Sequence, residues 1–202
     1  MYSSRIGLPT LSAALLAVAA MSWAGPKAPQ ASSPLANATV LVIRHAEKPE
    51  EGTGLTPAGE ARAKAYALYF HKLTIDGKPF RVNHIFATKD SKKSYRERLT
   101  VEPLGKAVNL AIDDRFKNNS FAELAEDLKT HPYGKDILIC WHHGKIPELV
   151  QALGGPTTLI PGGKWPAATF DWVVELKFDP SGKIDLKRTK VIHEHLMPGD
   201  SK

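Results

Sequence analysis

Short apolar runs rich in β-branched residues alternate with helical patterns along most of the chain, and this alternation constrains the fold more than any other feature. The pattern predicts buried strands at residues 38–43, 82–87 and 136–141, and two later strands at 170–178 and 184–195. Such alternation predicts an α/β fold, a three-layer α/β/α sandwich in which helices cover both faces of a mostly parallel sheet. Ligands of such sheets bind where the strands end, at their carboxyl edge.

Local signals indicate where the intervening helices begin and which faces they bury. Thr56 and Pro57 are typical of an N-cap and a first helical residue. Ser120 and Glu123 have the spacing of a capping box. On these two helices, apolar side chains share one face at Ala58, Ala61, Ala65 and Leu68, and at Phe121, Leu124, Ala125 and Leu128. Two further helices are expected over 99–111 and 146–153.

The first 24 residues have the pattern of a secretory signal peptide. Arg5 precedes an almost wholly apolar stretch at 11–21, and Ser22 and Ala24 place small residues at the −3 and −1 positions of a cleavage site. The apolar stretch is shorter than the roughly 20 residues that a membrane span needs, so we expect cleavage and no stable membrane anchor. The expected protein is exported, periplasmic or secreted, with a signal peptide at 1–24, a disordered leader at 25–37 and one domain at 38–198.

The composition is that of an ordinary globular protein, and it narrows the classes of function. Of 202 residues, 43% are hydrophobic and 24% are charged, which argues against a collagen-like or intrinsically disordered chain. The single cysteine excludes an intramolecular disulfide and a cysteine-rich zinc site. The net charge of +6 is modest, and basic residues near the C-terminus lack interleaved aromatic side chains. No nucleic-acid partner is therefore expected.

Titratable side chains follow two of the predicted strands at the point where each strand ends. Arg44 and His45 end the first strand, and His142 and His143 follow the strand at 136–141. A buried arginine needs an anionic partner, and the backbone N–H groups at the helix start after His142 also favour an anion. An imidazole among cations is biased toward its neutral, nucleophilic form. These residues together predict a pocket for a phosphate-sized anion beside a nucleophile.

In four ordered blocks, the sequence resembles the histidine phosphatase superfamily, whose members have the phosphoglycerate-mutase-like fold. The blocks are Arg44-His45-Ala46-Glu47, Leu55-Thr56-Pro57-Ala58-Gly59, Arg96 followed by Thr100-Val101-Glu102-Pro103-Leu104, and Trp141-His142-His143-Gly144-Lys145-Ile146-Pro147. The resemblance extends from about Val40 to Leu153. Each block alone is a weak signal, whereas four in the right order and spacing are specific.

The resemblance implies a role for each matching residue. His45 attacks phosphorus and becomes phosphohistidine, from which water then releases phosphate. Arg44, Arg96 and His142 bind the phosphoryl oxygens and stabilise the charge spread over them in the transition state. The implied protein is a phosphatase that acts on a small phosphorylated substrate and needs no metal and no organic cofactor.

Two departures from the family pattern leave the assignment of site residues open. His143 stands where the family has a small residue, so it is an alternative to His142 as the second catalytic histidine. The segment before Arg96 is longer and more basic than usual, so Arg98 is an alternative to Arg96 if the register of the match shifts.

The acid that would protonate the leaving group is also missing from its usual places. Asn118 lies near the expected glutamate of mutase-like members, and His143 occupies the position of the aspartate of acid phosphatases. Glu47, Asp113 and Asp114 are the candidate proton donors. The missing acid argues against a mutase. It leaves phosphatases of good leaving groups, such as phosphohistidine, phosphoanhydrides or acyl phosphates, or a weak enzyme.

Two other classes of function compete with a histidine phosphatase. His193 and His195 lie on one face of a predicted strand and could ligate zinc together with His142 and His143. The chain lacks an H-E-x-x-H motif, and its end is a poor place for a preorganised metal site, so metal hydrolysis is the weaker alternative. The other alternative is a non-catalytic binding module that keeps the phosphate pocket.

Overall fold

The computed structural model describes Met1 and residues 32–200 of the chain. The predicted signal peptide after Met1, and the predicted leader up to residue 31, lie outside the described residues. The described domain contains a six-stranded sheet in the order β5-β4-β6-β1-β7-β8. Its strands are β1 (Thr39–Arg44), β4 (His84–Ala87), β5 (Ile112–Asp113), β6 (Asp136–Trp141), β7 (Trp172–Lys177) and β8 (Lys190–His193).

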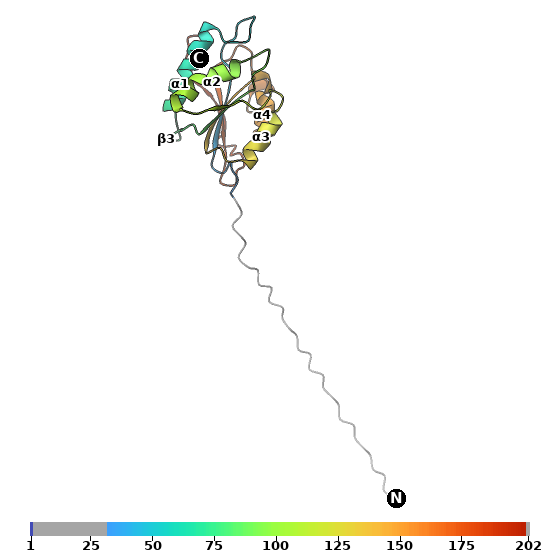
Figure 1. Cartoon of the computed structure of the whole chain (residues 1–202). Helices are drawn as coiled ribbons and strands as arrows, with labels where there is room; N and C mark the ends of the chain where they lie inside the picture. Colours follow the sequence, from blue (N-terminus) through green and yellow to red (C-terminus); the bar gives the residue numbers. More distant parts are fainter. Residues whose placement is uncertain (2–31, 201–202) are drawn as a thin grey trace. The chain divides into compact units, whose positions relative to one another are not determined.

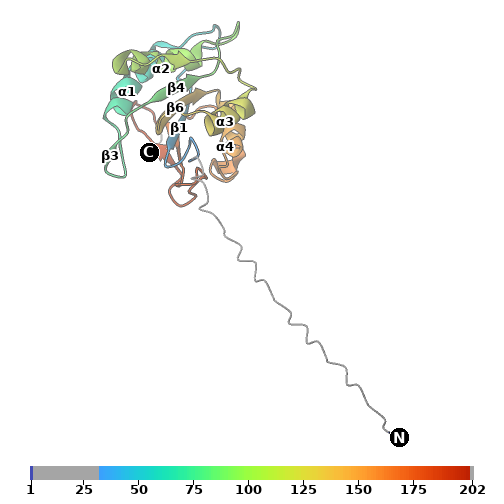
Figure 2. The same ribbon diagram turned by 60° about the horizontal axis from the view of Figure 1, so that its bottom comes forward.

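Neighbouring strands in most of the sheet are parallel, and antiparallel pairing is confined to one edge. β1 pairs with β6, β6 with β4, and β4 with β5, all in parallel. β7 pairs antiparallel with β1, and β8 pairs antiparallel with β7. The predicted α/β architecture with a mostly parallel sheet is confirmed (Figures 1 and 2).

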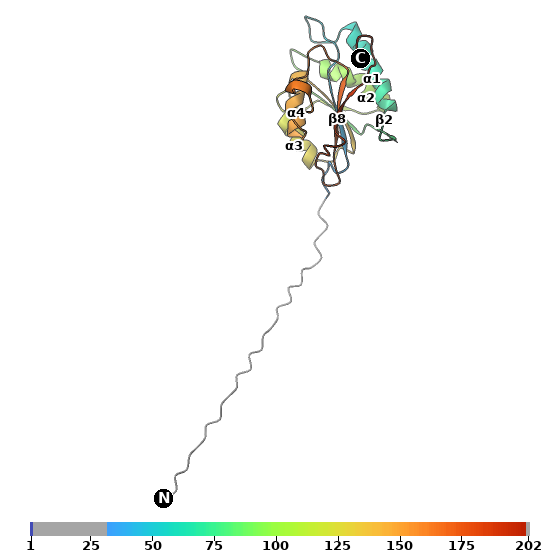
Figure 3. The same cartoon turned by 180° about the vertical axis from the view of Figure 1, so that it is seen from behind.

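Helices cover both faces of the sheet (Figures 1 and 3). On one face α1 contacts α2, and on the other α3 contacts α4. The bounds of these helices are α1 (Pro57–Lys72), α2 (Arg96–Val108), α3 (Phe121–Thr130) and α4 (Ile146–Ala152). The smaller elements are a hairpin of β2 (Thr74–Ile75) and β3 (Lys78–Pro79), and the 3-10 helices η1 (His143–Lys145) and η2 (Pro161–Gly163).

The two hydrophobic cores follow from the alternation of side chains along β1 and β6. Val40 and Val42 of β1 belong to the core beneath α3 and α4, whereas Leu41 and Ile43 belong to the core beneath α1 and α2. Cys140 of β6 lies in the second core and is fully buried. Because β1 is buried on both faces, the strand is a rigid support for the residues that follow it.

The predicted apolar face of α1 is wrong. Ala58 and Ala61 are exposed, and Leu68 is 65% exposed. The helix instead buries Tyr66 and Phe70, together with Gly59, Arg62 and Ala63. Two aromatic rings remove more apolar surface from water than a row of alanines, so they decide which face turns inward.

Several predicted boundaries also shift. α2 begins at Arg96 rather than 99, so the segment read as a basic loop includes its first turn. Ser120 precedes α3, but its side chain makes no capping hydrogen bond. The folded unit extends beyond 38–198, because Leu35 is fully buried and Asp200 is paired with Arg62. Within residues 32–200, no helix has the length and apolar character needed to cross a bilayer.

Candidate active site

The carboxyl ends of β1 and β6 bring the predicted catalytic residues to one edge of the sheet. The strands are parallel neighbours, and Arg44 stands opposite Trp141 in the register. His45 and His142 are therefore the next residues on adjacent strands, and their ring centroids lie 5.9 Å apart. The ring of His143 lies 5.8 Å from that of His45. The structure thus brings together the three histidines that the sequence placed after these two strands.

His45 is held as a neutral ring with one defined tautomer. The residue is 1% exposed, and its Nδ1 lies 2.7 Å from the carbonyl oxygen of Ala46. A carbonyl oxygen only accepts, so Nδ1 carries the proton and the ring lone pair is on Nε2. Burial, assisted by the charge of Arg44, lowers the pKa of His45 to about 3. At neutral pH, Nε2 is therefore an uncharged nucleophile.

Residues of two sequence blocks hold the loop that carries His45. The Ala46 N–H donates to Oγ1 of Thr100, on α2, at 2.9 Å. At the start of α1, the Thr56 N–H donates to the carbonyl oxygen of Glu47 at 3.0 Å. Gly59 lies so close to this loop that a Cβ there would be 2.4 Å from the same carbonyl oxygen. The two threonines and the glycine of these blocks therefore position the loop that carries the nucleophile.

We expect Gly59→Ala to destabilise the protein by about 1–3 kcal/mol, the usual cost of overpacking. The new methyl group would meet the backbone of Glu47, which cannot rotate away as a side chain would. Urea unfolding monitored by circular dichroism measures this cost. Gly54→Ala is the matched control, because its Cβ would make only an ordinary contact, 4.0 Å from Leu99. Equal unfolding free energies of the two variants would contradict the assigned role of Gly59.

His142 has the opposite tautomer from His45. It is the N-cap of η1, and its Nδ1 accepts from the Gly144 N–H at 3.2 Å. The proton of a neutral His142 ring is therefore on Nε2, which can donate to an anion. Burial lowers the pKa of His142, while the negative charge of Glu97 acts in the opposite direction. A nucleophilic nitrogen and a hydrogen-bond donor thus stand side by side at neutral pH.

His143 stacks on His142 with a centroid distance of 4.5 Å. Its Nδ1 is buried and has no hydrogen-bond partner among the described residues. Burial, followed by the charge of Arg44, lowers the pKa of His143 to about 4. The charges of both Arg44 and Arg96 act on His142, whereas His143 is influenced by Arg44 and Lys48. The influence of both arginine charges favours His142 as the anion-binding histidine.

Arg44 is buried at the end of β1, and one of its nitrogens holds a distant loop. Nη1 donates to the carbonyl oxygens of Ala167 at 2.7 Å and Thr169 at 3.0 Å, with Pro166 at 3.3 Å. The guanidinium lies 3.9 Å from the ring centroid of Phe170. Its Nε is buried without a partner among the described residues. Burial lowers the pKa of Arg44 to about 10, so the group remains charged at neutral pH.

Arg96, at the start of α2, has the second guanidinium of the site. Its Nε donates to the carbonyl oxygen of Gly54 at 3.1 Å, and Nη2 donates to that of Gly52. The side chain therefore fixes the loop between β1 and α1 while its charge reaches His142. Arg98 instead pairs with Asp90 at 2.8 Å and with Glu102 at 3.5 Å. The arrangement favours Arg96 over Arg98 as the arginine of the site.

The sequence matches no protein-family model and no curated protein. Among solved structures, phosphoglycerate mutase from Plasmodium falciparum matches with a TM-score of 0.52 and 17% identity, covering 82% of this chain and 98% of that chain. The chain has a phosphoglycerate-mutase-like fold. The protein histidine phosphatase SixA complexed with tungstate matches with a TM-score of 0.48 and 16% identity, covering 77% of this chain and 97% of that chain. Mycobacterial glucosyl-3-phosphoglycerate phosphatase in complex with inorganic phosphate matches with a TM-score of 0.43 and 13% identity, covering 77% of this chain and 95% of that chain.

In this phosphoglycerate-mutase-like fold, the candidate proton donors predicted from sequence are engaged elsewhere. The Glu47 carboxylate pairs with Arg62, with a shortest N–O distance of 2.8 Å. Asp113 lies on β5 and pairs with Arg115 at 3.1 Å. Two strands separate β5 from β1, which places Asp113 about 14 Å from the nucleophile strand at the usual strand spacing. Asp114 is the next residue, directly after the end of β5.

Glu97 is a buried carboxylate near the site that sequence reasoning missed. It is 3% exposed in the first turn of α2, and it accepts a hydrogen bond from Ser94 Oγ at 2.9 Å. Its charge is the main influence that raises the pKa of His142. Its position directly after Arg96 could have indicated that it lies near the site. The predicted start of α2 at residue 99 instead placed both residues in a solvated loop.

A second missed feature is a buried ion-pair network centred on Arg62 of α1. Arg62 is 2% exposed and contacts Glu47, Glu194 at 3.1 Å and Asp200 at 2.5 Å. It therefore links the nucleophile loop to the C-terminal segment. Burial raises the pKa of Glu194 to about 8. A cavity of about 250 Å³ adjoins this network and is also lined by Phe170.

The zinc set considered from sequence is not assembled. The ring of His193 lies 5.9 Å from that of His195 and 5.7 Å from that of Trp172, on the antiparallel edge of the sheet. Within residues 32–200, neither belongs to a group of three metal-ligating side chains with donor atoms in mutual reach.

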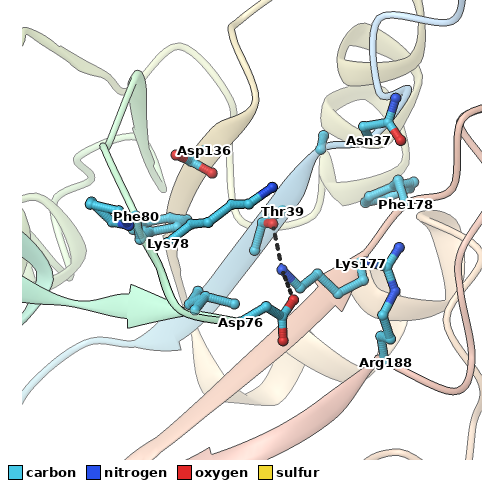
Figure 4. Close-up of a pocket in the computed structure, with 12 residues that line it drawn as sticks. Asn37, Thr39, Asp76, Lys78, Phe80, Asp136, Lys177, Phe178 and Arg188 are labelled. Carbon is cyan, nitrogen blue, oxygen red and sulfur yellow. Dashed lines mark hydrogen bonds and ion pairs between the residues drawn. The ribbon is translucent and has the colours of Figure 1, made fainter.

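A cavity of about 520 Å³ lies at the amino end of β1 (Figure 4). His45 follows the opposite end of that strand. Lys177 projects into it, and its Nζ is bonded to Asp76 at 2.9 Å and to Thr39 Oγ1 at 3.1 Å. The amine is thus already neutralised within the protein, and no histidine lines the cavity. The candidate active site is therefore the carboxyl edge of the sheet.

Proposed function

We propose that the protein is a phosphatase of the histidine phosphatase superfamily that hydrolyses a small phosphorylated compound through a phosphohistidine at His45. The observation that carries this proposal is the pair of complementary tautomers at the ends of β1 and β6. His45 presents a lone pair on Nε2, and His142 presents a proton on Nε2. The phosphoglycerate-mutase-like fold and the four sequence blocks support the same assignment.

In the first step, the His45 Nε2 lone pair forms a bond to phosphorus while the bond from phosphorus to the leaving oxygen breaks. The leaving group departs with the electron pair of that bond. The ring of His45 becomes positively charged, and the carbonyl oxygen of Ala46, 2.7 Å from Nδ1, stabilises that charge. The His45 ring is already uncharged in its buried position, so it does not have to lose a proton before it attacks.

The phosphoryl oxygens are stabilised by the groups that surround His45. The His142 Nε2–H and the unpartnered Nε–H of Arg44 supply donors, and Arg96 retains N–H donors beyond those bonded to the loop at 52–54. These charges and dipoles are fixed by the fold before substrate arrives, which is how a site stabilises phosphoryl transfer. In the second step, a lone pair of water forms a bond to phosphorus while the bond to Nε2 breaks and its electron pair returns to the ring. The attacking water loses a proton to the solvent, so inorganic phosphate leaves and His45 is neutral again.

The surroundings of the site favour substrates with good leaving groups. Glu47 is paired with Arg62, and Asp113 lies on a distant strand, so neither of these carboxyl groups is placed to protonate an ester oxygen. The remaining buried carboxylate near the site, Glu97, accepts a hydrogen bond from Ser94 Oγ. Phosphohistidine, phosphoanhydrides and acyl phosphates have better leaving groups than an alkyl ester and depend less on an acid supplied by the protein. The N-terminal sequence further supports export of the mature protein to the periplasm or the medium.

Trapping of the phosphoenzyme tests this proposal. The wild-type protein is mixed with acetyl phosphate, quenched within the first turnover in base, and digested for mass spectrometry. We expect an acid-labile, base-stable phosphoryl group on the peptide that contains His45, followed by release of inorganic phosphate. Binding of inorganic phosphate with neither adduct nor turnover, over a panel that includes phosphoramidate and pyrophosphate, would support the binding-module alternative instead.

A further inference from the structure

We propose that His45, His142 and His143 together form a binding site for a divalent zinc ion. Each of these residues offers one ring nitrogen, and the three nitrogens all lie within 4.8 Å of one another. The rings surround a common space, since the rings of His142 and His143 stack on each other and both face His45 at about the same distance. The proposed zinc site does not depend on whether the protein is a phosphatase.

The observed spacing is close to what zinc requires. Nitrogens bound at 2.0–2.1 Å in a tetrahedral site lie about 3.3–3.4 Å apart, so the longest separation has to shorten by roughly 1.4 Å. Rotation of the half-buried ring of His143 supplies such a change, because its Nδ1 has no hydrogen bond to break. Three imidazoles and one open position form the ligand set of many zinc centres, and imidazole also suits copper and nickel.

The electrostatic surroundings set the expected strength of binding. The Nδ1 of His45 is bonded to the Ala46 carbonyl oxygen, which leaves its Nε2 lone pair available, and the Nδ1 of His143 has no hydrogen-bond partner among the described residues. The nearby positive charges of Arg44 and Arg96 oppose a divalent cation, although backbone carbonyls already engage both guanidinium groups. Turning His142 from Gly144 toward a metal also gives up one hydrogen bond, at about 1 kcal/mol. These costs predict weaker binding than at a structural zinc site.

Direct titration tests the site without reference to catalysis. Zn²⁺ is added to chelator-treated, dialysed protein at pH 7.5 and followed by calorimetry and by competition with a chromophoric chelator. We expect one ion per chain for the wild type. Loss of one of three ligands in His143→Ala should weaken binding by at least about tenfold, since even second-shell changes cost 10- to 100-fold. X-ray absorption of the wild-type complex should show imidazole nitrogens in the first shell.

His71→Ala is the matched control, because His71 is an exposed histidine at the end of α1, outside the cluster. Its affinity for Zn²⁺ should equal that of the wild type. His143→Gln, which retains most of the side-chain volume, serves where the alanine variant unfolds, as judged by circular dichroism. Wild-type affinity in both His143 variants, or no saturable binding by the wild type, would overturn the proposal. Because the readout is metal binding, either result is independent of whether a phosphoenzyme forms.

Discussion

Replacing His45 by Gln is expected to lower turnover of acetyl phosphate by at least about 10⁴-fold, the scale on which enzymes lose rate with their nucleophile. The amide N–H₂ of Gln can still donate to the carbonyl oxygen of Ala46, so the loop has a substitute for the hydrogen bond of Nδ1. The amide nitrogen has no lone pair available for attack on phosphorus. Steady-state kinetics and the phosphoenzyme assay, run on both proteins, measure the loss.

Binding of inorganic phosphate by His45→Gln shows whether the variant has lost only its nucleophile or also the phosphate-binding pocket. Arg44, Arg96 and His142 remain in His45→Gln, so calorimetry should give a dissociation constant for phosphate within a few-fold of the wild-type value. Turnover comparable to that of the wild type would remove His45 from the mechanism. Lost turnover together with lost phosphate binding would instead indicate that the pocket had collapsed.

The same variant should also differ from the wild type in acid stability. The pKa of His45 is about 3 in the folded state, below its ordinary value of 6.5. The unfolded chain therefore binds this proton first as the pH falls, and wild-type stability decreases between pH 6.5 and the folded-state pKa. Gln does not titrate, so His45→Gln should lose less stability than the wild type between pH 6.5 and 4 in urea unfolding.

Local sequence signals predicted the elements that carry the site. Buried strands with continuous apolar runs are bounded sharply, and β6 has the predicted limits of 136–141. Thr56 caps α1 as expected, with its Oγ1 accepting from the Gly59 N–H at 3.1 Å. His45 and His142 follow two strands that were predicted from sequence, and the parallel pairing of β1 with β6 places them next to each other. The sequence therefore contained the fold class and the candidate residues, whereas the strand pairing that joins them is a long-range contact.

Contacts between distant segments could not be predicted in the same way. Arg44 reaches carbonyl oxygens more than 120 residues away, and no local pattern specifies such a partner. Glu97 was hidden because the helical periodicity of α2 becomes apparent only after its first turn. The row of apolar side chains on α1 predicted the wrong buried face. The helix instead buries the face that contains its two aromatic side chains and Arg62. Charged residues at buried positions thus account for most of what the sequence concealed.

Replacing Arg62 by Met should destabilise the protein by about 3–5 kcal/mol, the cost of removing one partner from a buried ion-pair network. Met fills the space of the arginine stem, but it leaves the carboxylates of Glu47 and Asp200 without their cation. The pKa of Glu194 is about 8, so that group is mostly protonated at pH 7 and contributes less to the loss. Urea unfolding at pH 7 provides the measurement.

Lys64→Met is the matched control, because Lys64 is exposed on the same helix two residues later and should change stability by no more than about 0.5 kcal/mol. Arg62→Lys keeps the charge and serves where the Met variant does not fold. A loss below about 1 kcal/mol in Arg62→Met would show that the network is not a buried one in solution. A loss of stability of the expected size, accompanied by lower turnover, would show that the ion pairs of Arg62 with the C-terminal segment and with Glu47 also support the loop of His45. The pair of residues that flanks Ala46 would then have separate tasks, with His45 performing the chemistry and Glu47 anchoring the loop through Arg62.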